Sequence, residues 1–525
     1  MTELAEVDPA APRDADVWAA PPRWAGAVAG VVAGALGLFV GHVVAQFGDG
    51  VSPLDLVGSS FVDRTPRWLK EWAIANFGTN DKLVLEIGAY CVMFVVALSL
   101  GVTSRRRATV YTIGSFAVAL VGSVSAAERA GTPALSIFAP FVGAAIGSIV
   151  FAVACDALVG KWLDARRPHV SRVPVGWDRR RFLRTTVAAG TAASIAGVVS
   201  TRREGDRLDR IESQRPTSLP SADGGAVSAD EFHPTDPFVT PISDFYRIDT
   251  ALSFPNVDLD RWRLRISGLV DQPVELSYQD LLERPQVERT ITLCCVSNEI
   301  GGPLIGNAVW QGVLLSELLS EAGVADEAEQ VFSTSLDGWT CGFPVENALD
   351  GRDCLVALGM NGEALPLVHG FPARLVVPGL YGYVSATKWL STIELTTWDR
   401  RGYWIPRGWS RLGPVKTQSR IDVPRRGQTV SSGEFVIAGT AWAQHTGIAT
   451  VEVRVDDEPW REATLADDVS DDTWRQWKIL WNATPGEHRL TVRATDKSGY
   501  TQTDRVAPVA PDGATGWHYR RIKVV

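Results

Sequence analysis

The chain has 525 residues, 46% of them hydrophobic, and a formal net charge of -9. This length exceeds one ordinary domain and predicts two or three domains with attachments. The acidic balance gives no reason to expect a nucleic-acid partner. Six cysteines are too few for a disulfide framework in a chain of this length.

Long apolar runs dominate the first 200 residues. Residues 1–23 are polar and rich in Pro and Ala, and we expect them to be disordered. Each run that follows is close to the ~20 residues that cross a bilayer, and frequent Gly and Ala suit close helix packing in lipid. We therefore predict a membrane domain of four to five helices over residues 24–200; the alternative is a set of buried helices in a soluble domain. The four clearest runs are Trp24–Phe47, Leu83–Val102, Ala108–Ala127 and Leu135–Leu158.

Basic residues predict the orientation of this domain. Arg105–Arg107 separates the second and third runs, and a second basic stretch, Lys161–Arg181, follows the fourth. With the N-terminus inside, both basic stretches also lie inside, as the positive-inside rule requires. The chain is then a multi-pass protein of the cell membrane whose C-terminal part is extracytoplasmic.

Residues 178–184 read Asp-Arg-Arg-Arg-Phe-Leu-Arg and precede a mild apolar run, Thr185–Ser200. This segment resembles a twin-arginine export signal, although it is internal. The alternative is the basic flank of a fifth membrane helix. Both interpretations place the remainder of the chain outside the cytoplasm.

An α+β domain is predicted over residues 232–413, after a charged linker at residues 201–231. Short strands such as Trp262–Ser267 mix with helices expected at Ser277–Glu283 and Gln311–Ala322. The absence of a regular strand–helix alternation in the sequence favours α+β over a doubly wound sheet.

Residues 414–525 predict a third, all-β domain. Strand patterns separated by turn residues have the spacing of an immunoglobulin-like sandwich. The expected strands are Val436–Ala441, Ala449–Val455, Trp474–Trp481 and Glu487–Thr495.

Cys294 and Cys295 are candidates for chemistry because they end a Thr-rich apolar strand just before the Gly301–Pro303 turn. A thiol at a strand end in a turn-rich pocket suits a metal ligand or a nucleophile. Neighbours on a strand face opposite sides, so one of the two at most faces a site. The alternative is a buried, inert thiol.

A second candidate is the stretch His369–Trp389, where turn residues surround a short apolar strand, Leu375–Val377. His369, Arg374 and Lys388 stand among these turns. Such cations suit a deeply bound anionic ligand. The alternative is a surface loop with stray charges.

Several pieces in this order resemble the sulfite oxidase family of molybdopterin-dependent oxidoreductases. The resemblance covers residues 232–411, and its most specific part is the His-Gly-Phe-Pro-x-Arg to Lys-Trp signature. The sandwich resembles that family's C-terminal dimerisation domain. The pieces are Cys295–Asn298, Asn307–Gly312, Met360–Pro366, His369–Trp389 and Trp404–Trp409.

The resemblance implies a role for individual residues. Cys295 would be the thiolate ligand of molybdenum, a soft donor for a metal that changes oxidation state. Residues implied to contact the molybdopterin are Tyr246, Asp249, Asn298, His369, Arg374, Gly382, Ser385 and Lys388. With Cys295, the residues implied on the catalytic side are Arg247, Trp310, Tyr403 and Trp409.

The sequence departs from the family at positions that bear on the substrate. Glu299 and Ile300 stand where sulfite oxidases have Arg after the Cys segment, and Asp512–Ala514 replaces another Arg. Only Arg247 remains as a clear cation for an anion such as sulfite.

We therefore predict a membrane-anchored oxidoreductase that transfers an oxygen atom on a small extracytoplasmic substrate without specificity for sulfite. Alternatives are an S-oxide or N-oxide reductase of the same fold and a non-catalytic, membrane-tethered binding or scaffold protein. The resemblance implies a molybdenum–molybdopterin cofactor and dimerisation through the C-terminal domain. No haem is predicted, so electrons would pass to a separate cytochrome or quinone.

Overall fold

The computed structural model describes residues 22–47, 50–66, 69, 72, 76, 81–105, 107–128, 132–155, 179–224 and 232–525. The expected disorder at the N-terminus concerns residues that lie almost entirely outside these ranges. The chain divides into two compact units. One is Met1–Leu208 with Ala251–Ser253, and the other is Asp209–Thr250 with Phe254–Val525.

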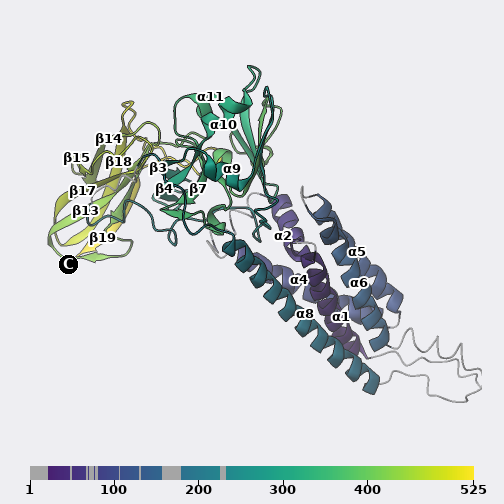
Figure 1. The fold of residues 1–525 in the computed structure, drawn as a ribbon. Coiled ribbons are helices and arrows are strands. Elements are labelled where there is room, and N and C mark those ends of the chain that lie inside the picture. Colours follow the sequence, from purple (N-terminus) through teal and green to yellow (C-terminus); the bar gives the residue numbers. More distant parts are fainter. Residues whose placement is uncertain are drawn as a thin grey trace, which may run out of the picture. The chain divides into compact units, whose positions relative to one another are not determined.

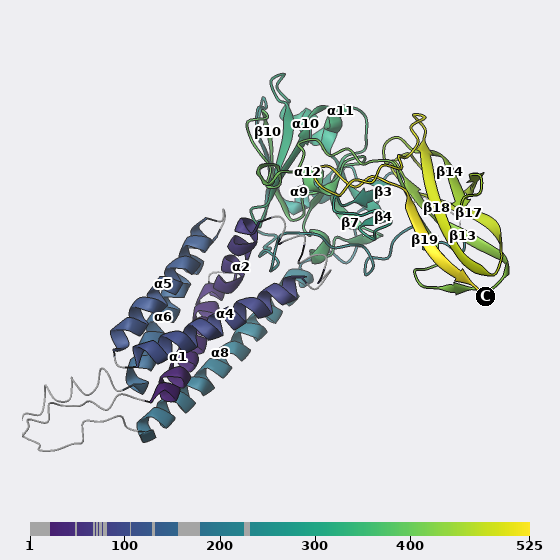
Figure 2. The same cartoon turned by 180° about the vertical axis from the view of Figure 1, so that it is seen from behind.

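The first unit is a helical bundle (Figures 1 and 2). Five of its helices are long and apolar enough to cross a membrane, which agrees with the predicted runs and adds a fifth helix at α8. The shorter α2 begins at Pro53, where the Ser52 side chain accepts hydrogen bonds from the N–H groups of Leu54 and Asp55. The bounds are α1 (Arg23–Gln46), α2 (Pro53–Arg64), α4 (Asp81–Ser104), α5 (Ala108–Ala127), α6 (Ala134–Ala154) and α8 (Arg179–Ser213).

Small residues allow the helices of this bundle to approach closely. A Cβ atom at Gly101 of α4 would collide with the backbone of Gly26 and Gly30 in α1. On another face of α1, Gly37 meets the backbone of Gly143 in α6. Close backbone approach is how membrane helices gain packing energy when burial from water contributes little.

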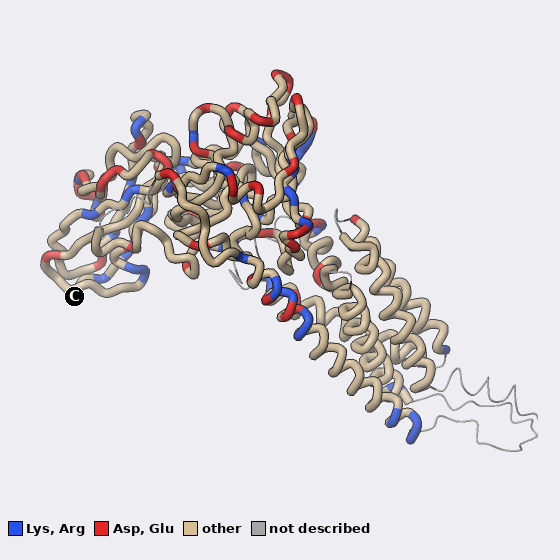
Figure 3. Tube along the Cα trace, viewed as in Figure 1, with Lys and Arg blue, Asp and Glu red and all other residues tan. Residues whose placement is uncertain are grey.

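Charged side chains are sparse along the bundle and gather at its ends (Figure 3). Arg105 lies beside Gly26, and Phe182 packs edge-on against Trp24 at 5.7 Å between ring centroids. The basic start of α8 and Arg105 therefore lie at the end of the bundle where α1 begins.

The predicted linker at residues 201–231 differs from the structure, because α8 continues without a break from Arg179 to Ser213. Arg and Glu are good helix formers, and Glu204 and Arg207 form an i,i+3 ion pair of 2.5 Å. The charges that suggested a linker thus stabilise an exposed extension of the helix. Residues 225–231 lie outside the described part of the chain.

The α+β part of the second unit contains two sheets. The first has the strand order β2-β1-β10-β5-β6, and the second has β3-β4-β7-β8 with β9 paired to β7. The strands of the first are β1 (Leu264–Gly268), β2 (Val274–Leu276), β5 (Gln330–Ser335), β6 (Thr340–Pro344) and β10 (Leu390–Thr396). Those of the second are β3 (Val287–Cys294), β4 (Ile305–Leu314), β7 (Leu355–Met360), β8 (Glu363–Ala364) and β9 (Arg374–Val376).

Short helices connect these strands. Ser277 caps α9 in a reciprocal capping box with Asp280, as its position before the helical pattern predicts. The helix expected at Gln311–Ala322 is helical only from Leu315 onward, since β4 continues to Leu314 and pairs with β7. The first leucine of the helical pattern, Leu314, is still part of β4, so the leucine spacing alone does not show where the strand ends and the helix begins. The helices are α9 (Tyr278–Glu283), α10 (Leu315–Ala322), α11 (Glu346–Leu349) and α12 (Gly382–Ser385).

The C-terminal part is an all-β sandwich, as predicted. Its sheets have the orders β11-β13-β17-β16 and β12-β19-β18-β14-β15, and Ile437, Val451, Trp477 and Leu490 are fully buried between them. The strands are β11 (Gln418–Val423), β12 (Thr429–Val430), β13 (Gly433–Trp442), β14 (Ile448–Val455), β15 (Arg461–Glu462), β16 (Thr464–Leu465), β17 (Arg475–Ala483), β18 (Gly486–Asp496) and β19 (His518–Val524). The fold class therefore agrees with the sequence prediction in all three parts.

Candidate active site

One cavity of the second unit collects most of the residues singled out in the sequence. Its volume is about 140 Å³. Four chain segments form its walls: residues 245–250, the turn after β3, the β5–β6 turn, and the stretch from His369 to Trp389 with the tryptophans that follow it. The lining residues used below are Tyr246, Asp249, Cys295, His369, Arg374, Gly382, Tyr383, Lys388, Trp404 and Trp409.

Cys295 reaches this cavity because β3 ends at Cys294 and the chain turns sharply after it. The Cys295 N–H donates to the Leu304 carbonyl oxygen at 3.0 Å, and the Ser297 N–H donates to the Cys295 Sγ at 3.4 Å. Cys294 lies beside it, and its Sγ is directed to the Cys295 carbonyl oxygen at 3.5 Å. Cys295 alone of these two thiols lines the cavity. Burial raises the pKa of the Cys295 thiol, so a bound metal is what would deprotonate it.

Arg374 and His369 form the floor of the cavity. Gly370 adopts a left-handed φ of 116°, which turns the chain between the 3-10 helix Leu367–His369 and β9. Arg374 donates to the His369 carbonyl oxygen at 3.1 Å and lies 4.9 Å above the Trp310 ring. Desolvation by burial lowers the pKa of Arg374 to about 10, which still leaves it protonated at neutral pH.

His369 is neutral in this arrangement. Its Nε2 lies 3.2 Å from the Ile242 carbonyl oxygen, so Nε2 carries the proton and Nδ1 remains an acceptor. Desolvation, followed by the nearby Arg374 charge, lowers the pKa of His369 to about 4.

Lys388 is held by a buried carboxylate. Its Nζ donates to the Asp249 Oδ2 at 2.6 Å, and both side chains are less than one-tenth exposed. Desolvation lowers the pKa of Lys388 to about 8, although Asp249 opposes this change. Asp249 Oδ2 also accepts from Arg247 Nε at 3.0 Å. The lysine therefore remains cationic at neutral pH and lies beside Arg374.

Aromatic rings form the remaining wall. Trp409 lies 6.0 Å from Trp404 and 5.6 Å from Tyr383, measured between ring centroids. The Tyr383 hydroxyl donates to the Ser410 carbonyl oxygen at 2.6 Å, which fixes that ring. This wall is apolar and rigid.

Five residues from the sequence-based set do not line the cavity. Trp310 is fully buried beneath Arg374 and donates from Nε1 to the Ile291 carbonyl oxygen. Arg247 is partly exposed, pairs with Asp249 and stacks on Phe254. The others are Asn298, whose Oδ1 accepts from Leu304 N–H, Ser385, whose Oγ donates to the Tyr381 carbonyl oxygen, and Tyr403, which packs edge-on against Trp404.

Other lining residues were not selected from the sequence. They include Ser335, Asp337 and Trp339 from the β5–β6 turn, and Tyr383 and Trp389 from the cation-rich stretch. The Asp337–Gly338 pair is an ordinary hairpin signal. Its place at the cavity depends on the pairing of β5 with β10, which no local pattern encodes.

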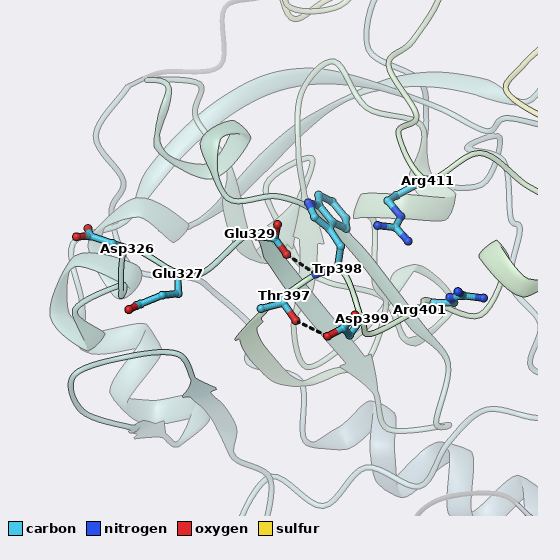
Figure 4. A pocket seen from close by; sticks show the side chains of 8 residues that line it. All are labelled: Asp326, Glu327, Glu329, Thr397, Trp398, Asp399, Arg401 and Arg411. Atoms are coloured by element: carbon cyan, nitrogen blue, oxygen red, sulfur yellow. Dashed lines mark hydrogen bonds between the residues drawn. The ribbon is translucent and has the colours of Figure 1, made fainter.

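A larger hollow of about 680 Å³ lies elsewhere in the second unit (Figure 4). Asp326 and Glu327 stand on one side of it and Arg401 on the other. Glu329 accepts a hydrogen bond from the Trp398 N–H at 2.7 Å, and Arg411 lies 5.1 Å from the Trp398 ring. No cysteine lines this hollow among the residues that the structure describes.

The residues of the smaller cavity fit a metal carried by an anionic organic cofactor. Cys295 offers one soft donor, and Arg374 and Lys388 offer cations for a phosphate. Gly382 also lines the cavity, and a Cβ there would lie 3.3 Å from the Ala386 Cβ. The described residues contain no group of three or more His, Cys, Asp or Glu side chains that could hold a metal ion.

Comparison with known proteins agrees with this fit. The family model of the oxidoreductase molybdopterin binding domain matches residues 251–404, and that of the bacterial Ig domain matches residues 418–492. The uncharacterized oxidoreductase YuiH of Bacillus subtilis (strain 168) is 38% identical over 156 residues, which cover 30% of this chain and 76% of YuiH.

More distant relatives have names that state an activity. Mitochondrial sulfite oxidase of Homo sapiens is 30% identical over 324 residues, 52% of this chain and 59% of the human protein. The chain thus spans about three fifths of that relative. The structure of the sulfane dehydrogenase SoxCD from Paracoccus pantotrophus aligns with a TM-score of 0.50 and 25% identity over 60% of this chain and 90% of that chain. With the cavity, these matches show that the chain belongs to the sulfite oxidase family of molybdopterin-binding oxidoreductases.

Proposed function

We propose that this protein is a membrane-anchored, molybdopterin-dependent oxidoreductase that acts on a small substrate outside the cytoplasm. The observation that carries the proposal is the meeting of Cys295, Arg374 and Lys388 in one cavity. These residues come from segments almost 100 positions apart, and the fold brings a thiol and two cations to the same walls. When bound, the molybdenum cofactor supplies oxygen-atom transfer.

The protein residues hold and orient this group. Cys295 ligates the metal as a thiolate. Arg374 and Lys388 bind the phosphate, Arg374 with its planar fork and Lys388 as a point charge that Asp249 aims. His369 presents Nδ1 as an acceptor, because its Nε2–H is used by Ile242. The aromatic wall excludes water from the reacting atoms.

A neutral organic substrate suits this cavity better than sulfite. The cations of its described lining are Arg374 and Lys388, and the phosphate of the cofactor occupies both in this proposal. Arg247 is directed to Asp249 and does not line the cavity. The apolar rings Tyr383, Trp404 and Trp409 favour an organic group. Reduction of an S-oxide or N-oxide is therefore our alternative to oxidation of a substrate by the same site.

The helical unit anchors the protein in the cell membrane. The five helices of the described residues that are long and apolar enough to span a membrane support this proposal, and five crossings would leave the two ends of the unit on opposite sides of the bilayer. Arg105 and the basic start of α8 lie at the end where α1 begins, and the positive-inside rule puts that end in the cytoplasm. The second unit then lies outside. In this proposal, residues 178–184 serve either as a twin-arginine export signal or as the basic flank of α8.

Electrons must leave or enter through a partner. We propose a separate cytochrome or quinone for this role, because the residues assigned above supply one redox centre. The sandwich domain is the proposed surface for a homodimer, by analogy with the family. A non-catalytic scaffold is the remaining alternative and requires no metal.

Metal and pterin analysis of the full chain tests the proposal. The protein is purified in detergent from a host that makes the cofactor. We expect about one molybdenum and one pterin per chain and little reaction of oxidised enzyme with sulfite, and oxidation of reduced enzyme by S-oxides or N-oxides would favour the reductase alternative. Protein without molybdenum would leave the scaffold alternative, whereas rapid turnover of sulfite would refute only the substrate assignment.

A further inference from the structure

The turn that follows Cys295 is held by the sandwich domain. Arg420 in β11 donates from Nη1 to the Gly302 carbonyl oxygen at 3.0 Å. The His518 ring lies so close to Gly301 that a Cβ atom there would collide with it. Ile300 approaches Gly516, where an added Cβ would lie 2.8 Å from its Cδ1. Three consecutive residues of the turn thus contact one face of the sandwich.

Hydrogen bonds within the turn connect these contacts to Cys295. The Leu304 carbonyl oxygen accepts from the Cys295 N–H at 3.0 Å, and the Leu304 N–H donates to Asn298 Oδ1 at 2.8 Å. Gly302 N–H donates to the Glu299 carbonyl oxygen at 2.9 Å. A displacement of Gly301 or Gly302 is therefore transmitted to the backbone that carries the thiol.

Arg420 and His518 are themselves fixed. Arg420 Nε donates to Asp422 Oδ1 at 2.6 Å, and the two side chains are 10% and 7% exposed. His518 Nδ1 accepts from the N–H of Ile421 at 2.9 Å, and Ile421 lies between Arg420 and Asp422 in β11. The guanidinium and the imidazole are thus held by one strand and cannot adjust independently.

We infer that Arg420 and His518 are positioning residues for the Cys295 thiolate: the sandwich domain clamps the Ile300–Gly302 turn and thereby fixes the backbone that carries the metal ligand. This inference rests on the proposed ligation of molybdenum by Cys295. It gives the sandwich a function in the chemistry of the site, beside any function in dimerisation.

The test uses the full chain in detergent and four variants. Arg420→Met removes charge and hydrogen bonds, whereas Arg420→Lys keeps the charge and changes the geometry. Arg420→Met/Asp422→Asn removes both charges of the pair. Arg461→Met is the matched control, because Arg461 also belongs to the sandwich and donates to a backbone carbonyl oxygen, that of Leu480 at 2.9 Å. Readouts are molybdenum content, midpoint potential and the paramagnetic resonance spectrum of the half-reduced metal.

We expect each Arg420 variant to change the resonance spectrum, because the thiolate moves. The midpoint potential and the spectrum should change most in Arg420→Met and in the double variant, which lose the hydrogen bond to Gly302, while Arg461→Met matches wild type in every readout. If Arg420→Met does not fold, Arg420→Lys decides by its spectrum. Wild-type spectra and potentials in loaded Arg420 variants would overturn the clamp and leave the proposed function intact. A wild-type chain without molybdenum would overturn both.

Discussion

Cys294 and Cys295 are adjacent thiols with different surroundings. The Cys295 side chain lines the cavity and accepts from the Ser297 N–H, while the Cys294 side chain is buried outside the cavity lining and directed to a backbone carbonyl. The chain reverses at this point, so the two side chains leave the strand end in different directions. The two thiols therefore differ in their position relative to the cavity and not in their intrinsic reactivity.

Replacing each thiol by a hydroxyl tests this difference. Cys295→Ser should lower turnover below detection with a change in unfolding free energy of about 1 kcal/mol, typical of a point substitution. Cys294→Ser should retain most of the wild-type turnover. Steady-state assays and denaturant unfolding of both variants measure these effects, and the reversed outcome would assign the ligand to Cys294.

Lys388 shows how a buried charge is prepared for an anion. Its side chain is 9% exposed, and Asp249 offsets part of the cost of burying it. Lys388→Met keeps the length of the side chain but removes the charge-assisted hydrogen bond to a phosphate, which contributes about 1.5–3 kcal/mol. We expect the molybdenum content after dialysis to fall about tenfold or more.

The control for this variant is Lys497→Met. Lys497 is 39% exposed in the sandwich and pairs with Asp468 and Asp471. Metal analysis should find this variant as fully loaded as wild type. Equal molybdenum content in both variants would contradict a phosphate-binding function for Lys388.

At the scale of single residues, the sequence predicted the side chains that line the cavity better than those that lie beneath the lining. The signature placed His369, Arg374 and Lys388 at the cavity, because a short turn-rich stretch determines its own geometry. Trp310 and Tyr403 were assigned to the substrate side by resemblance, yet Trp310 is buried beneath Arg374. Whether a ring faces the cavity or supports its floor depends on the pairing of distant strands.

At the scale of elements, local patterns predicted strands and helices where one face is apolar. The sandwich strands agree closely with their alternating pattern, and α9 begins at its Ser cap. Gln311–Leu314 was assigned to a helix because four leucines recur at helical spacing. Those residues hydrogen-bond to β7 instead. The sequence pattern alone does not distinguish a strand from a helix here, since a short apolar run can be buried in either conformation.

The contact between β11 and β19 has a consequence for stability. His518 Nδ1 accepts from the Ile421 N–H, so the folded state requires an unprotonated Nδ1. Desolvation, with the nearby Arg520 and Arg420 charges, lowers the pKa of His518 to about 3. The unfolded chain binds the proton near pH 6.5. Stability from this group is therefore complete above pH 6.5 and is lost as the pH falls toward 3.

We expect the second unit to lose about 2 kcal/mol of unfolding free energy between pH 6.5 and pH 5 through His518 alone. His518→Asn retains an acceptor without a titrating group, so its loss over this range should be smaller by about that amount. Urea unfolding followed by tryptophan fluorescence at both pH values measures the difference. Parallel losses in the two proteins would show that His518 does not titrate with folding.

At the scale of the whole molecule, the catalytic and sandwich parts form one unit because they share many contacts. Trp474 of the sandwich donates from Nε1 to the Phe238 carbonyl oxygen, and its N–H donates to Thr292 Oγ1 in β3. Gln476 Nε2 likewise donates to the Asp236 carbonyl oxygen. The segment that continues to Tyr246 and Asp249 in the cavity is thus attached to the sandwich at its start. The sequence predicts the two domains but not this attachment, which joins residues about 240 positions apart.

The helical unit supplies a prediction about topology. In the proposed topology, the five candidate spans of the described residues put the start of α1 and the end of α8 on opposite sides of the membrane, and the basic residues of α8 lie beside the start of α1. A reporter enzyme that is active only outside the cytoplasm should be active when fused after Val525 and inactive when inserted between Arg105 and Arg107.

Replacing the arginines at positions 179–181 and 184 by Gln removes four positive charges from the start of α8. Because Lys and Arg near a span set its orientation, this variant should lower the activity of the fusion after Val525. Activity at the inserted position together with inactivity after Val525 would reverse the topology and place the molybdenum site in the cytoplasm.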